Sequence, residues 1–481
     1  MRALRLTLLP LFSFALIACG NAAESDTLPT VAGLIEGSTV SATVTDLGEG
    51  AFQVEYVFAT PQSAMIFSRS MGNYRLGAWT PLEPGSRIDR IAGFDALLFD
   101  TPVDHASFRV EARFARPDGD YAPFVAFSDG GIVVFTGQFE LLPEASRDTI
   151  EALGGQIDRW SGEQPVLGVR VRSSRPIIAD GESGLHATGE LIQGGGRFVY
   201  IGDASLVEGD SFIGVVDPGL PAWLSASFDA DLAAIFARYK AMWGFELDQP
   251  ASLLFAFGGY EAPGFSNKGG VLGSSLMLDA RGEGLREETP QLRHHLQWFF
   301  AHEAAHLFQN AGGVGTASAS DSWIHEGAAN AMANAALAEL TADPHAELVN
   351  VYGLAIADCT DGLSGGSLES AAERGRFQAY YDCGSLIALM TTALIPDQSL
   401  YQFWSGMQAA AREQGRELDT GFYLQAMEQS GADPSAVAAI DALISYGLTD
   451  PAQALNHALD QAGLNPVYDE EGRLTDMDFP A

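Results

Sequence analysis

The sequence is poor in positive charge. Its 481 residues include 26 Lys and Arg against 62 Asp and Glu, which gives a formal net charge of −36. A nucleic-acid partner needs basic side chains that neutralise phosphates, and the sequence has no basic stripe of that length, so we expect none. The acidity is typical of a solvated surface, and an acidic patch for a cationic substrate is the alternative.

Charged residues of both signs are scarce as well, at 18% of the chain, while 47% of the residues are hydrophobic. Disordered chains have the opposite balance, so the composition, with its 53 glycines, predicts a folded and loop-rich protein. A chain of this length buries a sizeable core, and its size predicts roughly two or three domains.

Long apolar runs are absent except near the N-terminus. Arg2 and Arg5 precede an apolar run from Leu6 to Ile17 that is too short to span a bilayer, which predicts a signal peptide over residues 1–18. Leu16-Ile17-Ala18-Cys19-Gly20 resembles a bacterial lipobox. The resemblance implies a lipidated Cys19, a tether over residues 19–33, and a membrane anchor outside the cytoplasm, facing the periplasm or the exterior. An ordinary cleaved signal peptide that contains a cysteine is the alternative.

Cysteine is also rare, with three in the whole chain. Once Cys19 is set aside, Cys359 and Cys383 remain in a compartment that permits oxidation, so a disulfide between them is our expectation. It would enclose residues 360–382 and contribute about 3 kcal/mol in the chain-entropy model. Two buried free thiols are the alternative.

The first half of the chain has the pattern of β-structure. From about Leu34 to Val215, short runs of alternating or β-branched residues are separated by clusters of Gly, Pro and Asp. This pattern predicts a mostly antiparallel β-rich domain over residues 34–216.

The pattern changes near Asp217, and Ser227–Trp243 has apolar residues at helical spacing. Gly269–Asp279 predicts one glycine-led strand, and helical signals dominate from Pro290 onward. We therefore expect an α+β chain whose second domain, over residues 217–481, is mainly helical with a small sheet.

The chemical signal lies in a helix that the sequence predicts from Pro290 to about Asn310. Thr289 supplies a capping hydroxyl, proline follows it, and Gly312-Gly313 follows the expected end. Apolar side chains surround this helix on nearly all sides, which predicts that its middle is buried. A buried carboxylate there needs a partner, because an unpaired charge is costly inside a protein.

The middle of this helix contains His302-Glu303-Ala304-Ala305-His306. His302 and His306 lie one turn apart on the same face, so both ring nitrogens can reach one zinc ion at about 2.0 to 2.1 Å. Glu303 faces the open coordination position without binding the metal, as a general base does. Since a motif this short also arises by chance, a third ligand is needed to decide its meaning.

A second segment supplies that ligand. Asp321 or Ser322 is expected to cap a helix that carries Glu326 in its first turn, and Trp323 to Gly327 form a Trp-x-x-Glu-Gly pattern. With these motifs the chain resembles the gluzincin metallopeptidases, especially alanyl-type and glycyl-type aminopeptidases. The resemblance implies a thermolysin-like catalytic domain and Glu326 as the third ligand of Zn²⁺.

The same resemblance covers Tyr380-Tyr381-Asp382-Cys383-Gly384. It implies that Tyr381, three residues before Gly384, donates a hydrogen bond to the oxyanion of the reaction. Tyr380 is the fallback for this role, and a packed aromatic pair is the alternative. A disulfide at Cys383 would hold the backbone of the tyrosine in place.

The chain departs from the family in one place. The family binds substrate backbone along a glycine-containing edge strand, which Gly269–Asp279 resembles in position. Alanyl-type enzymes carry a glutamate in that strand for the free amine of the substrate, whereas Gly269 to Leu278 contain no acidic residue and Glu261 lies off the motif.

Four further polar residues lie near the motifs. We expect His294, His295 and His325 to be surface residues or neighbours of the site, not ligands. Asn330, one turn after Glu326, is a candidate to orient a ligating histidine.

Together these features predict a zinc-dependent, aminopeptidase-like peptidase that acts on peptides or proteins outside the cytoplasm. A lipid-anchored binding or scaffolding protein with a structural or vestigial zinc site is the alternative.

Overall fold

The computed structural model describes residues 33–70, 72–114, 121–192, 195–209, 211–395 and 397–480. The predicted signal peptide, Cys19 and most of the predicted tether lie outside these residues. Across the described ranges, we find no helix with both the length and the apolar character that a membrane crossing requires.

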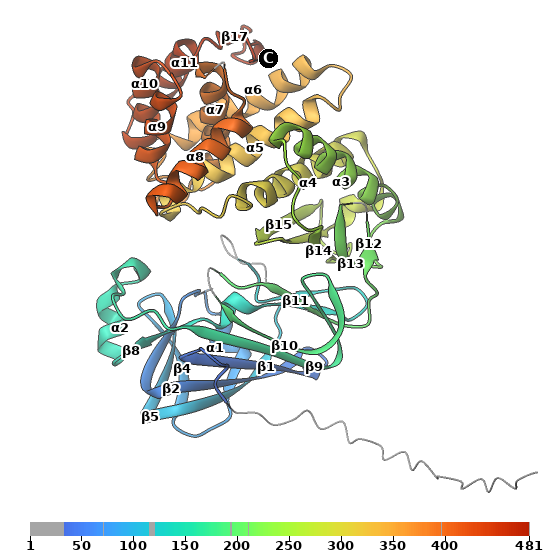
Figure 1. Ribbon diagram of the computed structural model, residues 1–481, viewed down its shortest axis with the longest axis vertical. Coiled ribbons are helices and arrows are strands. Elements are labelled where there is room, and N and C mark those ends of the chain that lie inside the picture. The colour runs from blue at the N-terminus through green and yellow to red at the C-terminus, as the bar shows by residue number, and fades with distance from the viewer. Residues whose placement is uncertain are drawn as a thin grey trace, which may run out of the picture. The chain divides into compact units, whose positions relative to one another are not determined.

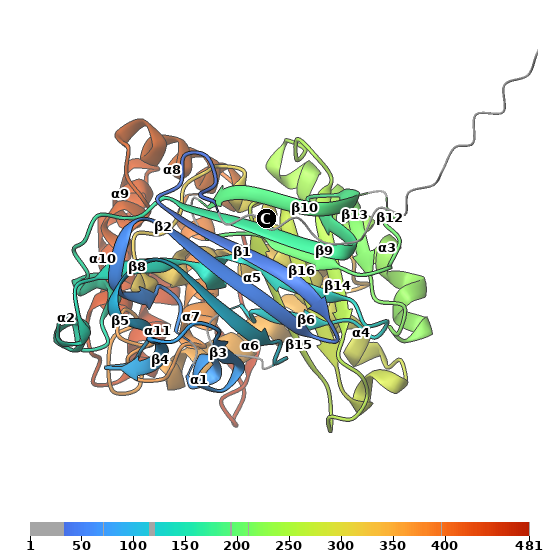
Figure 2. The same ribbon diagram turned by 90° about the horizontal axis from the view of Figure 1, so that it is seen from below.

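The N-terminal part is an 11-stranded sheet in which the described strands pair antiparallel, apart from the parallel pair β1–β9. Figure 2 shows β1, β2 and β9 running side by side. Two short helices accompany the sheet, α1 (Tyr74–Ala78) and α2 (Arg147–Leu153). The strands are β1 (Val40–Gly48), β2 (Ala51–Phe67), β3 (Trp79–Pro81), β4 (Ser86–Ile91), β5 (Phe94–Glu111), β6 (Phe124–Ala126), β7 (Ile132–Phe135), β8 (Leu141–Glu144), β9 (Leu167–Ala179), β10 (Glu182–Ile192) and β11 (Phe198–Ile201).

Alternation of side chains along the strands explains how this sheet builds a core. In β2, Phe52, Val54 and Tyr56 are buried, whereas the intervening Gln53 and Glu55 are partly exposed. Successive residues of a strand face opposite sides, so this period of two places one aromatic and aliphatic face inside. The predicted β-rich N-terminal part is therefore confirmed.

A second, smaller sheet has the strand order β12-β13-β14-β16-β15. Its strands are β12 (Val207–Glu208), β13 (Phe212–Val216), β14 (Ala251–Phe257), β15 (Ser266–Leu272) and β16 (Ser275–Arg281), and helix α3 (Ala222–Trp243) connects β13 to β14. The prediction of one strand over Gly269–Asp279 was wrong, because Gly273 adopts a φ of +58° and reverses the chain there. The glycine-containing strand β15 does lie at the edge of the sheet.

The remainder is helical, coloured from yellow to red in Figure 1, and ends in a small hairpin. The elements are α4 (Pro290–Asn310), α5 (Ser322–Ala338), α6 (Pro344–Gly362), α7 (Ala379–Leu394), α8 (Leu400–Gln414), α9 (Thr420–Gln429), α10 (Pro434–Ser445), α11 (Pro451–Gln461), β17 (Val467–Tyr468) and β18 (Leu474–Asp476). The expected α+β class, with a mainly helical second part and a small sheet, is confirmed.

Two helices of this part carry the motifs. Helix α4 begins as predicted, since the Thr289 hydroxyl accepts a hydrogen bond from the backbone N–H of Leu292 at 3.1 Å. Helix α5 differs from the prediction in detail. Asp321 occupies its N-cap position, but the carboxylate accepts hydrogen bonds from Thr420 instead of from the first turn of the helix. Because α5 begins at Ser322, Glu326 lies at the start of its second turn, not in the first.

A buried disulfide joins α6 to α7. Cys359 and Cys383 are bonded, as expected, and their side chains are inaccessible to solvent. Cys383 lies two residues after Tyr381, so the bond ties the N-terminal end of α7 to the neighbouring helix.

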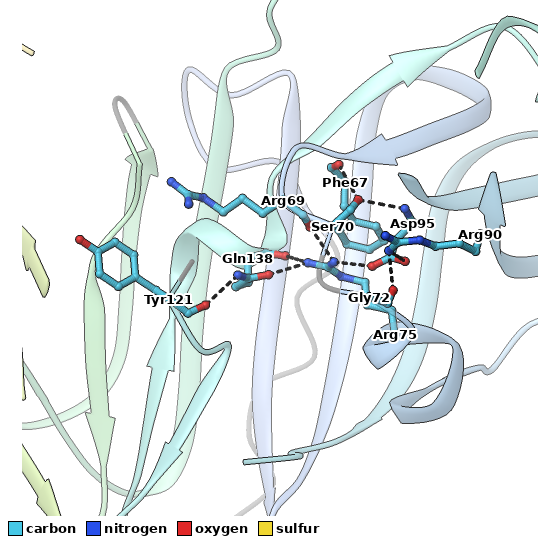
Figure 3. A network of polar contacts seen from close by, with 9 residues as sticks. All are labelled: Phe67, Arg69, Ser70, Gly72, Arg75, Arg90, Asp95, Tyr121 and Gln138. Carbon is cyan, nitrogen blue, oxygen red and sulfur yellow. Dashed lines mark hydrogen bonds and ion pairs between the residues drawn. The ribbon is translucent and has the colours of Figure 1, made fainter. Parts of the chain in front are cut away.

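A buried ion pair joins helix α1 to strand β5 of the first sheet (Figure 3). The Arg75 guanidinium, fully buried, donates to the Asp95 carboxylate at 2.8 Å and to both the carbonyl and the side-chain oxygen of Gln138 at 2.8 Å. Arg90 donates to the other Asp95 oxygen at 2.7 Å. The Gln138 amide in turn donates to the backbone carbonyl of Tyr121 at 3.0 Å, and the Tyr121 side chain reaches strand β15 of the second sheet.

We expect Asp95→Ala to lower the free energy of unfolding by about 3 to 5 kcal/mol, because it leaves the buried Arg75 charge without its counter-ion. Urea titration measures this loss. Asp100→Ala is the matched control, since Asp100 pairs with Arg87 on the surface, where both side chains are more than half exposed, and the expected loss is below about 1 kcal/mol. Equal losses for the two variants would contradict a stabilising role for the buried pair.

Candidate metal site

Three side chains from α4 and α5 converge on one point. The Nε2 atoms of His302 and His306 lie 3.2 Å apart, and the Glu326 Oε2 atom lies 3.3 Å from the first and 3.2 Å from the second. His302 is 6% exposed, and the side chain of Glu326 is 17% exposed. The predicted ligands are thus brought together in an almost equilateral triangle.

The dimensions of this triangle fit a tetrahedral metal ion. Ligand atoms bound to zinc at about 2.0 to 2.1 Å in tetrahedral geometry lie about 3.3 Å from one another. Two imidazole nitrogens and one carboxylate oxygen are also the chemical set that zinc takes in sites that keep a fourth position open. Among the described residues this is the one group of three or more His, Cys, Asp or Glu side chains that is close enough to hold a metal ion.

The charges of the triangle favour a cation at its centre. Burial raises the pKa of Glu326, but His306, His302 and His325 outweigh it and hold the pKa well below its usual range, so the carboxylate is ionised. Burial lowers the pKa of His306, yet the neighbouring Glu326 carboxylate raises it to about 9. A divalent cation would take the place of the proton that this cluster attracts.

Glu303 lies beside the triangle without belonging to it. It is 6% exposed, and burial raises the pKa of its carboxyl, an effect that the neighbouring His302 and His306 oppose. Gly269 on β15 makes room for this carboxyl, because a Cβ atom at that position would lie 2.5 Å from the Glu303 Cδ. The edge strand therefore passes directly over the carboxyl group.

Tyr381 lines the same pocket as the histidines. Its ring centroid is 5.8 Å from that of His302, and burial together with the Glu326 and Glu303 carboxylates raises the pKa of its hydroxyl. The hydroxyl therefore remains a hydrogen-bond donor at physiological pH. Tyr380, by contrast, is fully buried in the helical core and donates to the Glu369 carbonyl at 3.0 Å.

Two glycines explain why Tyr381 comes so close to Glu326. A Cβ atom on Gly327 of α5 would lie 2.2 Å from the Cα of Gly384 on α7, and a Cβ on Gly384 would meet the Trp323 carbonyl at 2.4 Å. The two helices are therefore in backbone contact at this crossing. Because Glu326 precedes one glycine and Tyr381 lies one turn before the other, the contact sets the distance between the two side chains.

The site opens into a pocket of about 180 Å³ that also includes Tyr121 and Val271. The Tyr121 ring covers Gly270, where a Cβ atom would lie 2.0 Å from Cε1 of the ring, and its hydroxyl donates to the Val271 carbonyl at 3.2 Å. Tyr121 is the residue whose backbone is held by the network of Figure 3. The segment before β6 thus contributes a side chain to this pocket, which the sequence analysis did not anticipate.

The other candidate residues lie outside the triangle. His294 pairs with Glu347 at 2.9 Å, His295 contacts the Asn267 amide oxygen at 3.0 Å, and His325 approaches the second Glu326 oxygen at 3.4 Å.

Asn330, the candidate to orient a histidine, and Glu261, which lies off the motif, are also outside the triangle. In the described part of the chain, the amide oxygen of Asn330 is buried without a hydrogen-bond partner, so it does not orient either histidine. Glu261 is exposed and does not line the pocket.

Two residues that the sequence analysis missed support the ligands. Gln309 is hydrogen-bonded to His306 at 2.7 Å. Trp298 packs on the His302 ring at 5.6 Å between centroids and donates to the Asn334 side chain on α5 at 2.8 Å. Both lie one turn from a histidine of the motif, which is the spacing that could have identified them.

The chain resembles solved structures at the level of fold. It shares its fold with an aminopeptidase N family protein from Idiomarina loihiensis, with a TM-score of 0.59 and 14% sequence identity over 87% of this chain and 78% of that one. Two further similar structures are a variant of an M1 zinc metallopeptidase from Deinococcus radiodurans bound to a Tyr-Ser-Ala substrate and yeast LTA4 hydrolase in complex with bestatin. The Deinococcus structure has a TM-score of 0.45 and 15% sequence identity over 85% of this chain and 93% of that one. The yeast structure has a TM-score of 0.48 and 11% sequence identity over 85% of this chain and 67% of that one. No family model and no curated protein sequence matches the chain.

Proposed function

We propose that the protein is a zinc-dependent peptidase in which His302, His306 and Glu326 hold the metal. One observation carries the proposal. The three candidate ligands, a carboxyl group that is not a ligand and a protonated tyrosine line the same small pocket. The fold shared with an aminopeptidase N family protein supports it.

Zinc bound at this position would act as a Lewis acid that polarises the scissile carbonyl and lowers the pKa of water. Glu303 is the proposed general base. Its carboxylate removes the proton of the attacking water and then returns it to the nitrogen of the leaving amine. Burial raises the pKa of Glu303 and so makes the carboxylate a better proton acceptor than an exposed glutamate.

Tyr381 and strand β15 are proposed to bind the reacting peptide. The Tyr381 hydroxyl donates a hydrogen bond to the oxyanion that forms when water attacks the carbonyl, a contribution of a few kcal/mol to the barrier. Strand β15 lies at the sheet edge above Glu303, and an extended peptide can add to such an edge through main-chain hydrogen bonds. Gly269 lets this strand lie close to the Glu303 carboxyl, and the Tyr121 ring packs on Gly270 beside it.

A structural zinc site in a scaffolding protein is less consistent with these residues. Structural sites usually complete the coordination of zinc with a fourth protein side chain. Here the group contains three ligands, and the space beside them is lined by Glu303 and Tyr381.

We also propose that the protein acts outside the cytoplasm on peptides or proteins and that a lipidated Cys19 anchors it to a membrane. The support for this location is the lipobox-like sequence at Cys19. The strong negative charge and the absence of a basic stripe give no support for a nucleic-acid partner.

Digestion of a mixed peptide library, with free and with acetylated N-termini, tests the activity. We expect one zinc ion per chain, hydrolysis that a chelator abolishes, and recovery when zinc is added back. Cleavage of free N-termini alone would identify an aminopeptidase, and cleavage of acetylated peptides an endopeptidase. One zinc per chain without cleavage of any peptide would favour the scaffolding alternative.

A further inference from the structure

Gln309 connects the two helices that carry the candidate ligands. It follows His306 by three residues on α4 and is 2% exposed. Its side-chain oxygen lies 2.7 Å from the His306 Nδ1 atom, and its side-chain nitrogen donates to the carbonyl of His325 on α5 at 3.1 Å. The Gln309 amide thus contacts the candidate ligand His306 directly. It also contacts His325, the residue that precedes the candidate ligand Glu326.

The partners of this amide fix its orientation. The His325 carbonyl only accepts hydrogen bonds, so the NH₂ group of Gln309 must face it. The amide oxygen then faces His306, and since this oxygen also only accepts, the hydrogen must be on Nδ1 of the imidazole. In the neutral ring this places the lone pair on Nε2, the atom that points to Glu326 and His302.

The backbone of Gln309 is held from a third helix. The Gln408 side chain on α8 donates to the Gln309 carbonyl at 2.7 Å, and Gln408 is itself 2% exposed. His302 has no comparable partner in the described structure, because its Nδ1 atom is buried without a hydrogen bond. The ring of His306 is therefore fixed by a polar contact, whereas that of His302 is fixed by packing against Trp298.

We propose that Gln309 is a positioning residue that sets the tautomer of His306 and holds its imidazole in place for metal binding. This inference rests on the proposed zinc site. Hydrogen-bond partners of ligating histidines typically change metal affinity by about 10- to 100-fold when they are lost.

The test compares zinc affinity, measured by competition with a chromophoric chelator, in the parent protein and in three variants. Gln309→Met keeps the length of the side chain and removes both hydrogen bonds, so zinc affinity should fall about 10- to 100-fold. Gln309→Glu keeps an acceptor for the His306 Nδ1–H, so affinity should return to within a few-fold of the parent even though the bond to the His325 carbonyl is lost. Gln297→Met is the matched control, the same substitution on the same helix at a glutamine that donates to the Asp231 carboxylate at 2.9 Å and does not line the pocket, and its zinc affinity should change less than about twofold.

Urea titration of the same proteins shows whether a change in zinc affinity is accompanied by a loss of stability. If Gln309→Met and Gln297→Met weaken zinc binding equally, or if Gln309→Glu weakens it as much as Gln309→Met, Gln309 has a structural role only and the inference is overturned. Equal zinc affinity in the parent and in Gln309→Met also overturns it, while the proposed zinc site stands. A parent protein that binds no zinc overturns both.

Discussion

Glu303→Gln is expected to retain zinc and to lower peptide hydrolysis by about 10² to 10⁴-fold, the usual contribution of a general base. Glutamine has the shape of glutamate, so it fits in the space that Gly269 leaves, but its amide cannot accept the proton of the attacking water. Because Glu303 is not one of the three convergent ligands, the metal content should not change. Rate measurement on a cleaved library peptide, combined with zinc analysis, gives both values.

Glu288→Gln provides the control. This residue precedes the same helix, pairs with Arg293 at the surface, and lies outside the pocket. Its hydrolysis rate should stay within about twofold of the parent, as is usual for surface substitutions. Full turnover in Glu303→Gln would remove the general-base assignment even if the zinc site is correct.

Tyr381→Phe is expected to lower kcat by about 10² to 10³-fold with little change in KM, since a donor to the oxyanion acts mainly in the transition state. The ring remains packed near His302 and only the hydroxyl is lost. Zinc content should equal that of the parent. Steady-state kinetics on one peptide substrate separates kcat from KM.

The neighbouring tyrosine offers a matched substitution. Tyr380→Phe removes a hydroxyl that donates to the Glu369 carbonyl in the core, so it should cost about 1 kcal/mol of stability and leave kcat within a few-fold of the parent. If Tyr380→Phe reduced kcat and Tyr381→Phe did not, the two assignments would have to be exchanged.

Local signals in the sequence were sufficient to predict the bounds of the helix that carries the metal motif. Thr289 and proline marked its start, the glycines after Asn310 marked its end, and the spacing of His302 and His306 placed both on one face. These features depend on residues within a few positions of one another, which a sequence displays directly. Glu326 and Tyr381 came from resemblance to a family, because no local rule connects them to α4.

Contacts that depend on tertiary packing could not be predicted from the sequence. The Gly327–Gly384 crossing that brings Tyr381 to Glu326, and the position of Tyr121 against Val271, join segments far apart in the chain. The hairpin of β15 and β16 was missed because Gly273-Ser274-Ser275 is only a short interruption between the apolar residues of Gly269–Asp279, and the positive φ of Gly273 reverses the chain there.

The proposed zinc site consists of three side chains from α4 and α5 that bind one metal ion and leave a position for water. Crystals of the zinc-loaded protein, measured above and below the zinc absorption edge, test it most directly. The structure predicts a single anomalous peak within about 2.0 to 2.2 Å of the His302 and His306 Nε2 atoms and of a Glu326 carboxylate oxygen. A protein without such a peak, or with the Glu326 carboxylate turned away from both imidazoles, would contradict the zinc site and the peptidase activity proposed for it.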